Sequence, residues 1–391
     1  MNAILHKVKQ LLNGRLYEEA LLYLEECKAC RHYMGGKCKL LDELRYAKRL
    51  AVGYCPEWDY PAYQKFANID DGRIKIVFPS VALPCGGAER WLVNLATGLD
   101  TTKFCICIGI ELYNACDKEL LEKARQAEFL IFGKKHVQKA SDSADIVLSW
   151  CYFPESHAKT KIFCSHGCDH WTDALVKDYK NGYTFAAVSE QAAVPWAQFN
   201  PTIINNGCDI ERLKAKKPRD QMRRRLGVKQ NEILIGFISR IVPEKNPLIV
   251  AITAHELREK GIPARAMFVG KRDRCPEYDD CIYIDRVEEI GNYLNALDIF
   301  MLPSNSEAFS LAITEAWLSK VPVVATPVGA IPELENKYGK MVERMGTCPT
   351  NAILNALKDK EMVENAYRVS VENFTLDSMV KRWETYFESF R

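Results

Sequence analysis

The chain has 391 residues, of which 48% are hydrophobic, and its 53 Lys and Arg residues nearly balance its 51 Asp and Glu residues. This length exceeds what one hydrophobic core usually organises, so we expect two or three domains. The near-neutral charge predicts neither a polyanionic partner nor an acidic tail.

The first segment, residues 1–70, has apolar residues at helical spacing and no strand-like run, which predicts a helical extension. No long apolar stretch follows a basic start, so we expect neither a signal peptide nor a membrane span. The fifteen cysteines of the chain fall largely in apolar segments, as buried reduced thiols do. Together these features predict a cytoplasmic protein.

Four cysteines of the extension form a candidate metal site. Cys27 and Cys30 have the two-residue spacing at which thiolates share one metal ion, and Cys38 and Cys55 lie near glycines suited to turns. A structural zinc ion and an iron–sulfur cluster both fit this set, as does a cysteine-rich segment that binds no metal. We interpret His32 as lying outside the ligand set.

From Arg73 onward, short β-branched runs alternate with amphipathic helical segments, a pattern typical of parallel sheets. The expected strands are residues 74–79, 104–110, 128–132, 145–150, 160–165 and 185–188, then 233–238, 266–270, 282–284, 299–302 and 321–325. We therefore predict an α/β protein with two doubly wound domains, residues 71–205 and 206–374. The charged run between the two sets, residues 212–225, is interpreted as a solvated surface helix rather than a nucleic-acid patch.

A glycine pair follows the first expected strand. Gly86 and Gly87 precede a helical run over residues 91–99, and paired glycines at such a turn allow a phosphate to approach the free amides of the helix. A routine strand-to-helix connection has the same pattern.

Two cations follow the first strand of the second set. Arg240 and Lys245 lie just beyond residues 233–238, at the carboxyl edge where open parallel sheets bind ligands. Fixed cations there suit a diphosphate, whereas a solvated loop would carry them incidentally.

Two glutamates follow a later strand of the same set. We expect Glu307 to precede a helix whose first turn is residues 308–311, with Glu315 two turns further on roughly the same face. A helix start aimed at a diphosphate, beside carboxylates that accept hydrogen bonds from sugar hydroxyls, forms a coherent donor site. The alternative is a helix-capping carboxylate and a surface glutamate.

From Ile74 to the C-terminus the chain resembles the family-four retaining glycosyltransferases of the GT-B fold, in which two Rossmann-like domains face each other across a cleft. The matching motifs, in the order of that family, are residues 86–90 (Gly-Gly-Ala-Glu-Arg), 165–167 (Ser-His-Gly), 187–190 (Ala-Val-Ser-Glu), 206–209 (Asn-Gly-Cys-Asp), Arg240 with Lys245, 269–270 (Val-Gly), 303–304 (Pro-Ser), Glu307 with Glu315, 322–329 (Pro-Val-Val-Ala-Thr-Pro-Val-Gly) and 332–333 (Pro-Glu).

The resemblance implies a role for each matched site residue. Arg240 and Lys245 would bind the donor diphosphate, Glu315 the ribose hydroxyls and Glu307 the transferred sugar. His166 would meet the sugar from the first domain. By the same resemblance the backbone amides of Phe309, Ser310 and Leu311 would cap the diphosphate, Val287 would lie near the base, and a final helix within residues 375–391 would rejoin the first domain.

The sequence departs from the family at a few positions. Ala308 and Ser310 stand where the family often has glycine, and Lys320 replaces a frequent glycine before residues 321–325. The first doubly wound domain is also short for the family.

The resemblance implies transfer with retention from a UDP-, GDP- or ADP-sugar without a catalytic metal, and no Asp-x-Asp element stands at a crevice position. The acceptor stays open among a lipid, a glycan, a protein, a small molecule and a modified nucleic acid. A catalytically idle nucleotide-sugar-binding scaffold and a nucleotide-sugar epimerase of the same fold are the alternative functions.

Overall fold

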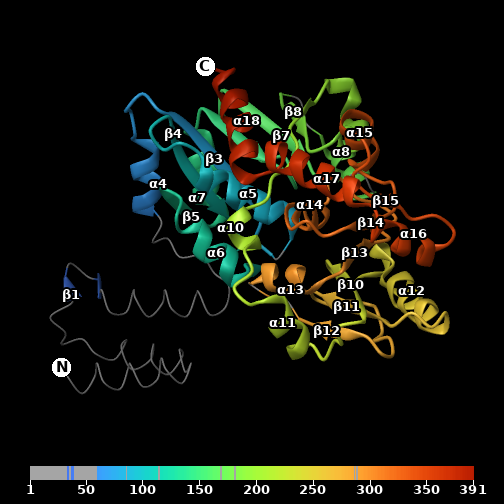
Figure 1. Ribbon diagram of the computed structural model, residues 1–391. Coiled ribbons are helices and arrows are strands. Elements are labelled where there is room, and N and C mark those ends of the chain that lie inside the picture. The colour runs from blue at the N-terminus through green and yellow to red at the C-terminus, as the bar shows by residue number, and fades with distance from the viewer. Residues whose placement is uncertain are drawn as a thin grey trace. The chain divides into compact units, whose positions relative to one another are not determined.

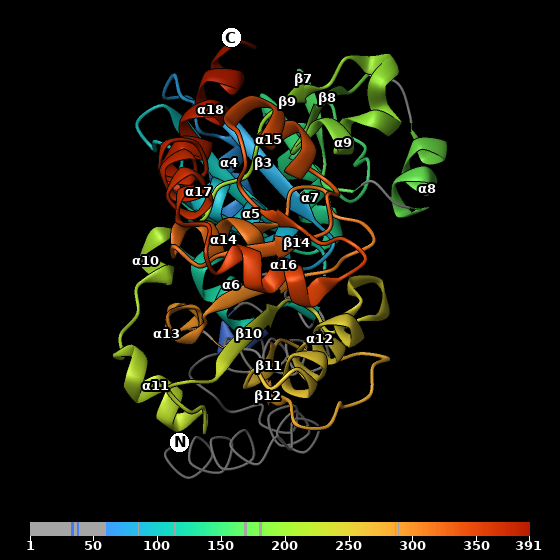
Figure 2. The same cartoon turned by 45° about the vertical axis from the view of Figure 1, so that its right-hand side comes forward.

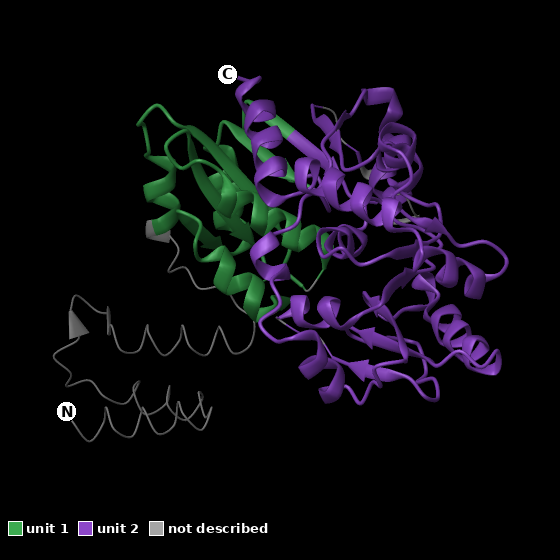
Figure 3. Cartoon of the chain, in the orientation of Figure 1, with its two compact units in different colours: residues 1–149, 154–161 green, residues 150–153, 162–391 purple. Residues whose placement is uncertain are grey.

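The computed structural model describes residues 60–84, 86–112, 115–167, 170–179, 182–285, 287 and 289–391, together with the backbone of residues 33–34 and 37–38. Figure 1 shows two parallel sheets surrounded by helices, which confirms the predicted α/β class. Contact density divides the chain into two compact units, coloured separately in Figure 3.

Within the extension the structure describes a short antiparallel hairpin, β1 (Tyr33–Met34) with β2 (Lys37–Cys38). This pair of two-residue strands was not predicted, since two residues carry no periodicity. Cys27, Cys30, Cys55 and the side chain of Cys38 lie outside the described residues, so the metal site stays a prediction. Among the described residues no group of three or more His, Cys, Asp or Glu could hold a metal ion.

The first unit, residues 1–149 and 154–161, contains four parallel strands in the order β5-β4-β3-β6. Its strands are β3 (Ile74–Ser80), β4 (Phe104–Ile110), β5 (Phe129–Phe132) and β6 (Ile146–Ser149), and its helices are α4 (Tyr60–Ala67), α5 (Gly87–Gly98), α6 (Lys118–Ala124) and α7 (Lys134–Asp142). Almost every residue of β3 and β4 is buried, as expected for parallel strands with both faces covered. The continuous apolar runs thus become the centre of the sheet.

Helix α4 belongs to the core of this unit. Phe66 is fully buried and meets the ring of Phe129 edge to face, with 5.5 Å between ring centroids. The last residues of the predicted extension therefore pack into the first unit.

The second unit contains the other strands of the first sheet, whose full order is β5-β4-β3-β6-β7-β8-β9. These strands are β7 (Thr160–Ser165), which belongs to this unit from residue 162 onward, β8 (Thr184–Ala187) and β9 (Thr202–Ile203). Helix α8 (His170–Asp178) follows β7, and α9 (Glu190–Ala193) and the 3-10 helix η3 (Val194–Phe199) follow β8. Phe163, Phe185 and Trp196 form a buried aromatic cluster that holds β7, β8 and η3 together. The ring centroids of Phe185 and Trp196 stack at 4.8 Å.

The second sheet lies entirely in this unit and has the order β12-β11-β10-β13-β14-β15. Its strands are β10 (Ile233–Ile238), β11 (Ala264–Val269), β12 (Ile282–Ile284), β13 (Ile299–Leu302), β14 (Val323–Ala325) and β15 (Glu343–Arg344). Its helices are α12 (Pro247–Glu259), α13 (Ile290–Ala296), α14 (Leu311–Leu318), α15 (Ile331–Tyr338), α16 (Pro349–Ala356) and α17 (Lys360–Asn373). Figure 2 shows α12, which packs beside α16, on one side of this sheet and α13 on the other.

The strand order reverses between β10 and β13. The chain builds β11 and β12 on one side of β10 and β13 to β15 on the other, so the loops after β10 and β13 diverge. Open parallel sheets bind ligands at such a switch point, outside the carboxyl ends of the strands. No helix among the described residues is long and apolar enough to cross a membrane.

A short parallel bridge joins residue 208 to the segment before α18 (Leu376–Glu388). Cys208 donates its amide to the Phe374 carbonyl at 2.9 Å, and its carbonyl accepts from the Leu376 amide at 2.8 Å. A methyl group on Gly207 would lie 2.1 Å from the Thr375 carbonyl oxygen, so only glycine allows this close approach. The expected final helix is present, with α18 starting at Leu376.

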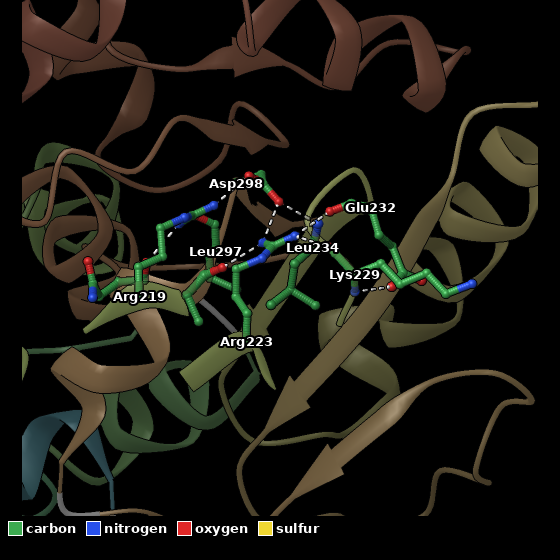
Figure 4. Close-up of polar contacts among 9 residues, drawn as sticks. Arg219, Arg223, Lys229, Glu232, Leu234, Leu297 and Asp298 are labelled. Carbon is green, nitrogen blue, oxygen red and sulfur yellow. Dashed lines mark hydrogen bonds and ion pairs between the residues drawn. The ribbon is translucent and has the colours of Figure 1, made fainter. Parts of the chain in front are cut away.

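The charged run at residues 212–225 is only partly solvated, with Lys214, Lys216, Asp220, Arg224 and Arg225 exposed. It contains α11 (Arg219–Arg225), in which Arg223 is only 5% exposed. Figure 4 shows Arg219 and Arg223 converging on Asp298, with ion pairs of 2.5 and 2.8 Å, and Asp298 also accepts the Leu234 amide at 2.7 Å. The prediction of a solvated helix holds for the exposed side chains and fails for Arg219 and Arg223, because these two arginines bind a carboxylate at the amino end of β13.

Candidate functional site

Three of the predicted site residues follow the two strands at the switch point. Arg240 lies two residues after the end of β10, and Lys245 ends the 3-10 helix η4 (Pro243–Lys245). Glu307 lies in the loop after β13, the strand that pairs with β10. Because neighbouring parallel strands end at the same edge, these residues share one edge of the second sheet.

Lys245 and Glu307 form a direct ion pair. The Lys245 Nζ lies 2.6 Å from the Glu307 Oε1, and the two side chains are only 16% and 12% exposed. The fully buried Ser304 donates its hydroxyl to the same oxygen at 2.7 Å. The ammonium group is thus held by a carboxylate. The guanidinium of the exposed Arg240, in contrast, has no hydrogen-bond or ion-pair partner among the described residues.

Gly329 supports the loop that carries Glu307. Its φ is +63°, and a methyl group there would lie 2.6 Å from the Glu307 carbonyl oxygen and 2.7 Å from that of Ala308. Only glycine combines this left-handed conformation with so close an approach. The position of Glu307 therefore depends on backbone packing as well as on its ion pair.

Helix α14 starts later than predicted. It begins at Leu311 with Ser310 as its N-cap, so residues 308–310 belong to the loop. Glu307 and Glu315 therefore do not share one helix face as expected. The backbone amides of Phe309, Ser310 and Leu311 have no acceptor within the described part of the chain, which leaves the helix start able to bind an anion.

Ser310 occupies the left-handed region, with φ of +65°. A side chain there costs about 1 kcal/mol, so Ser310→Gly should raise the free energy of unfolding by up to about 1 kcal/mol. Ser319, at the other end of α14, has φ of −97°. Ser319→Gly should lower stability instead, and chemical denaturation of both variants checks the contrast. Equal destabilisation by the two changes would contradict the assigned strain.

Lys320 has the same kind of backbone, with φ of +54°. Of the three positions at which the sequence departs from a family glycine, Ser310 and Lys320 are thus left-handed, and Ala308 is not.

Glu315 pairs with an arginine that the sequence analysis missed. Arg212, on α10 (Ile210–Leu213), places its Nη1 2.7 Å from the Glu315 Oε1. The run of charged residues 212–225 does not by itself predict which of its arginines pairs with Glu315. Its position three residues after the matched Asp209 is the one feature that separates Arg212 from the rest of the run.

His166 follows β7 and meets Trp150, with ring centroids 6.2 Å apart in an edge-to-face arrangement. Burial lowers the pKa of His166 to about 3. The imidazole is therefore neutral at physiological pH and can donate or accept hydrogen bonds without contributing charge.

The remaining predicted residues lie elsewhere. Gly86 and Gly87 are the N-cap and first residue of α5, in the first unit. A methyl group on Gly86 would meet the Glu89 carboxylate, so the same helix start already holds a negative charge. Val287 is half-buried between β12 and α13.

Glu333 has a strongly perturbed carboxyl. It lies in the first turn of α15 and accepts the Glu190 amide of α9 at 2.6 Å. Burial, opposed by this hydrogen bond and reinforced by the Glu190 charge, raises the pKa of Glu333 to about 7. The folded state consequently binds an extra proton between the ordinary carboxyl pKa and pH 7.

The free energy of unfolding should therefore fall as pH rises from about 4.5 to 7, because the folded protein loses the proton that Glu333 binds. Glu333→Gln removes this titration, so its free energy of unfolding relative to wild type should rise across that window by roughly 1–2 kcal/mol after allowance for solvent screening. The buried His166 works in the opposite direction but cancels in the difference. Denaturation series at pH 5, 6 and 7 measure the effect, and a constant difference would contradict it.

The fold is similar to that of solved GT-B glycosyltransferases. The Anabaena protein HepE in complex with UDP-glucose matches with a TM-score of 0.67 and 18% identity, over 81% of this chain and 100% of that chain. At this identity the likeness shows the fold. The molecule is thus a GT-B protein, with two doubly wound sheets.

Sequence comparisons show which glycosyltransferases this chain is similar to. Residues 232–359 match the family model described as glycosyl transferases group 1. The D-inositol 3-phosphate glycosyltransferase of Corynebacterium urealyticum is 28% identical over 195 residues, 44% of this chain and 43% of that protein. The N-acetyl-alpha-D-glucosaminyl L-malate synthase of Bacillus anthracis is 26% identical over 203 residues, 46% of this chain and 52% of that protein.

Residues 232–359 are thus similar to the group 1 glycosyl transferases, and the fold is that of GT-B proteins. The chain spans about half the length of the curated relatives it matches. The matched model covers the second sheet and the site at its switch point, from just before β10 to α16.

Proposed function

We propose that the chain is a retaining glycosyltransferase that moves a sugar from a nucleoside-diphosphate sugar to an acceptor. The observation that carries this proposal is the Lys245–Glu307 pair, held at the β10–β13 switch point beside the start of α14. A cation, a sugar-binding carboxylate and free helix amides are the groups that a sugar diphosphate requires.

The roles follow from the charges. Arg240, Lys245 and the amides of residues 309–311 stabilise the diphosphate as negative charge develops on it. Glu307 accepts hydrogen bonds from the sugar, and the neutral His166 donates or accepts one more. Glu315 accepts hydrogen bonds from the ribose.

In the proposed reaction the bond between the anomeric carbon and the diphosphate oxygen breaks, and the acceptor oxygen bonds to the same face of that carbon. The departing diphosphate oxygen takes the acceptor proton. The basic side chains supply the charge, so the proposed chemistry needs no catalytic metal, and transfer should persist in EDTA. The first domain, residues 71–205, would bind the acceptor.

A thermal shift screen with UDP-, GDP- and ADP-sugars tests the proposal. A donor that binds the native state raises the melting temperature in proportion to the logarithm of its concentration. UDP-glucose comes first, because the similarly folded HepE was solved with it. Product analysis with a donor that shifts the protein then shows whether the anomeric configuration is kept. No shift with any donor would count against the proposal.

A further inference from the structure

Arg212 and Glu315 form a shielded but reachable ion pair. Their side chains are 19% and 14% exposed, and 2.7 Å separates Nη1 from Oε1. A charge-assisted hydrogen bond in such a partly dehydrated place fixes a carboxylate more firmly than a surface pair does. The orientation of Glu315 therefore depends on where Arg212 stands.

The backbone around Arg212 is held from several sides. Besides its bridge to residues 374–376, Cys208 donates its thiol to the Leu311 carbonyl at 3.6 Å. At the other end of α10, a methyl group on Gly291 of α13 would lie 2.3 Å from the Leu213 carbonyl oxygen. Helix α10 packs against both α13 and α14. Arg212 thus projects from a rigid frame, as a group that orients another group must.

The pair engages one oxygen of the glutamate. Arg212 donates a hydrogen bond to the Glu315 Oε1, and the Glu315 Oε2 has no hydrogen-bond partner among the residues that the structure describes. An ionised carboxylate accepts at both oxygens. The arginine therefore fixes Oε1 and leaves Oε2, with the remaining capacity of Oε1, to accept from a pair of neighbouring hydroxyls.

We propose that Arg212 is a positioning residue that orients Glu315 toward the 2′- and 3′-hydroxyls of the donor ribose. This assignment rests on the proposed function, in which Glu315 binds the ribose. Arg212 itself contacts the carboxylate and acts through it. The arginine thereby sets how strongly the site prefers a ribonucleotide over its deoxy analogue.

Calorimetric titration of the full chain tests this role. UDP, GDP and ADP are each compared with their 2′,3′-dideoxy analogues. The wild type should bind the accepted ribonucleotide at least about 10-fold more tightly than the analogue, since hydrogen bonds to a charged acceptor are lost. Arg212→Gln should reduce this preference to within about 3-fold while binding of the dideoxy analogue hardly changes. Arg212→Lys, which keeps the charge, should retain part of the preference.

Arg219→Gln is the matched control. It removes an arginine of the same linker that pairs with a carboxylate, Asp298, at the opposite end of the second sheet, so it should lower the melting temperature and leave the ribose preference intact. If Arg212→Gln weakens both nucleotides equally or preserves the preference, Arg212 does not position Glu315. If none of the three diphosphates binds the wild type, the donor site itself is contradicted and this assignment falls with it.

Discussion

Lys245→Ala should lower the rate of sugar transfer by about 100- to 1,000-fold, the loss expected when one fixed group that stabilises developing charge is removed. The ammonium lies at the switch point, 2.6 Å from the Glu307 carboxylate. Its removal deprives the leaving diphosphate of a cation and leaves Glu307 repelling it. Both effects act on the reaction step, so kcat/KM should fall with kcat.

The measurement is steady-state transfer or donor hydrolysis with a donor that stabilises the wild type. Lys340→Ala is the matched control, because Lys340 also pairs with carboxylates but lies between α15 and β15. Its variant should keep near-normal turnover. Melting temperatures separate lost catalysis from lost folding, and undiminished turnover by a folded Lys245→Ala protein would refute the assigned role.

Asp298→Ala should lower the free energy of unfolding by about 3 kcal/mol or more. The carboxylate binds Arg219 and Arg223 and caps the Leu234 amide. Arg223 is almost fully buried, so its charge would remain in the interior without a counter-ion.

Urea denaturation measures this loss. Glu364→Ala provides the contrast, because the Lys320–Glu364 pair is 48% and 64% exposed and such pairs contribute under about 1 kcal/mol. Similar small losses from both variants would show that the buried cluster contributes no more than a surface ion pair.

The sequence predicted the long strands well because each is a continuous apolar run. Strands β4, β7, β10, β12 and β13 have the predicted bounds, and β3 is one residue longer. The two-residue strands β9 and β15 were missed, since two residues carry no periodicity. Short elements of this kind are defined by their neighbours in the sheet.

The arginine contacts could not be read from the sequence. Arg212 pairs with Glu315, which lies 103 residues later in the chain, and Arg223 pairs with Asp298, which lies 75 residues later. A run of charges looks the same whether water or a distant carboxylate pairs with it. The start of α14 was misplaced for a related reason, because Ser310 adopts a left-handed conformation that serine rarely takes.

We propose above that this site holds the diphosphate of a sugar nucleotide. Calorimetric titration with the nucleoside diphosphate that binds, beside its monophosphate and its nucleoside, tests it most directly. We expect the diphosphate to bind at least about 10-fold more tightly than the monophosphate, because Lys245, Arg240 and the start of α14 would contact the terminal phosphate. Equal affinity for the two nucleotides would contradict the claim.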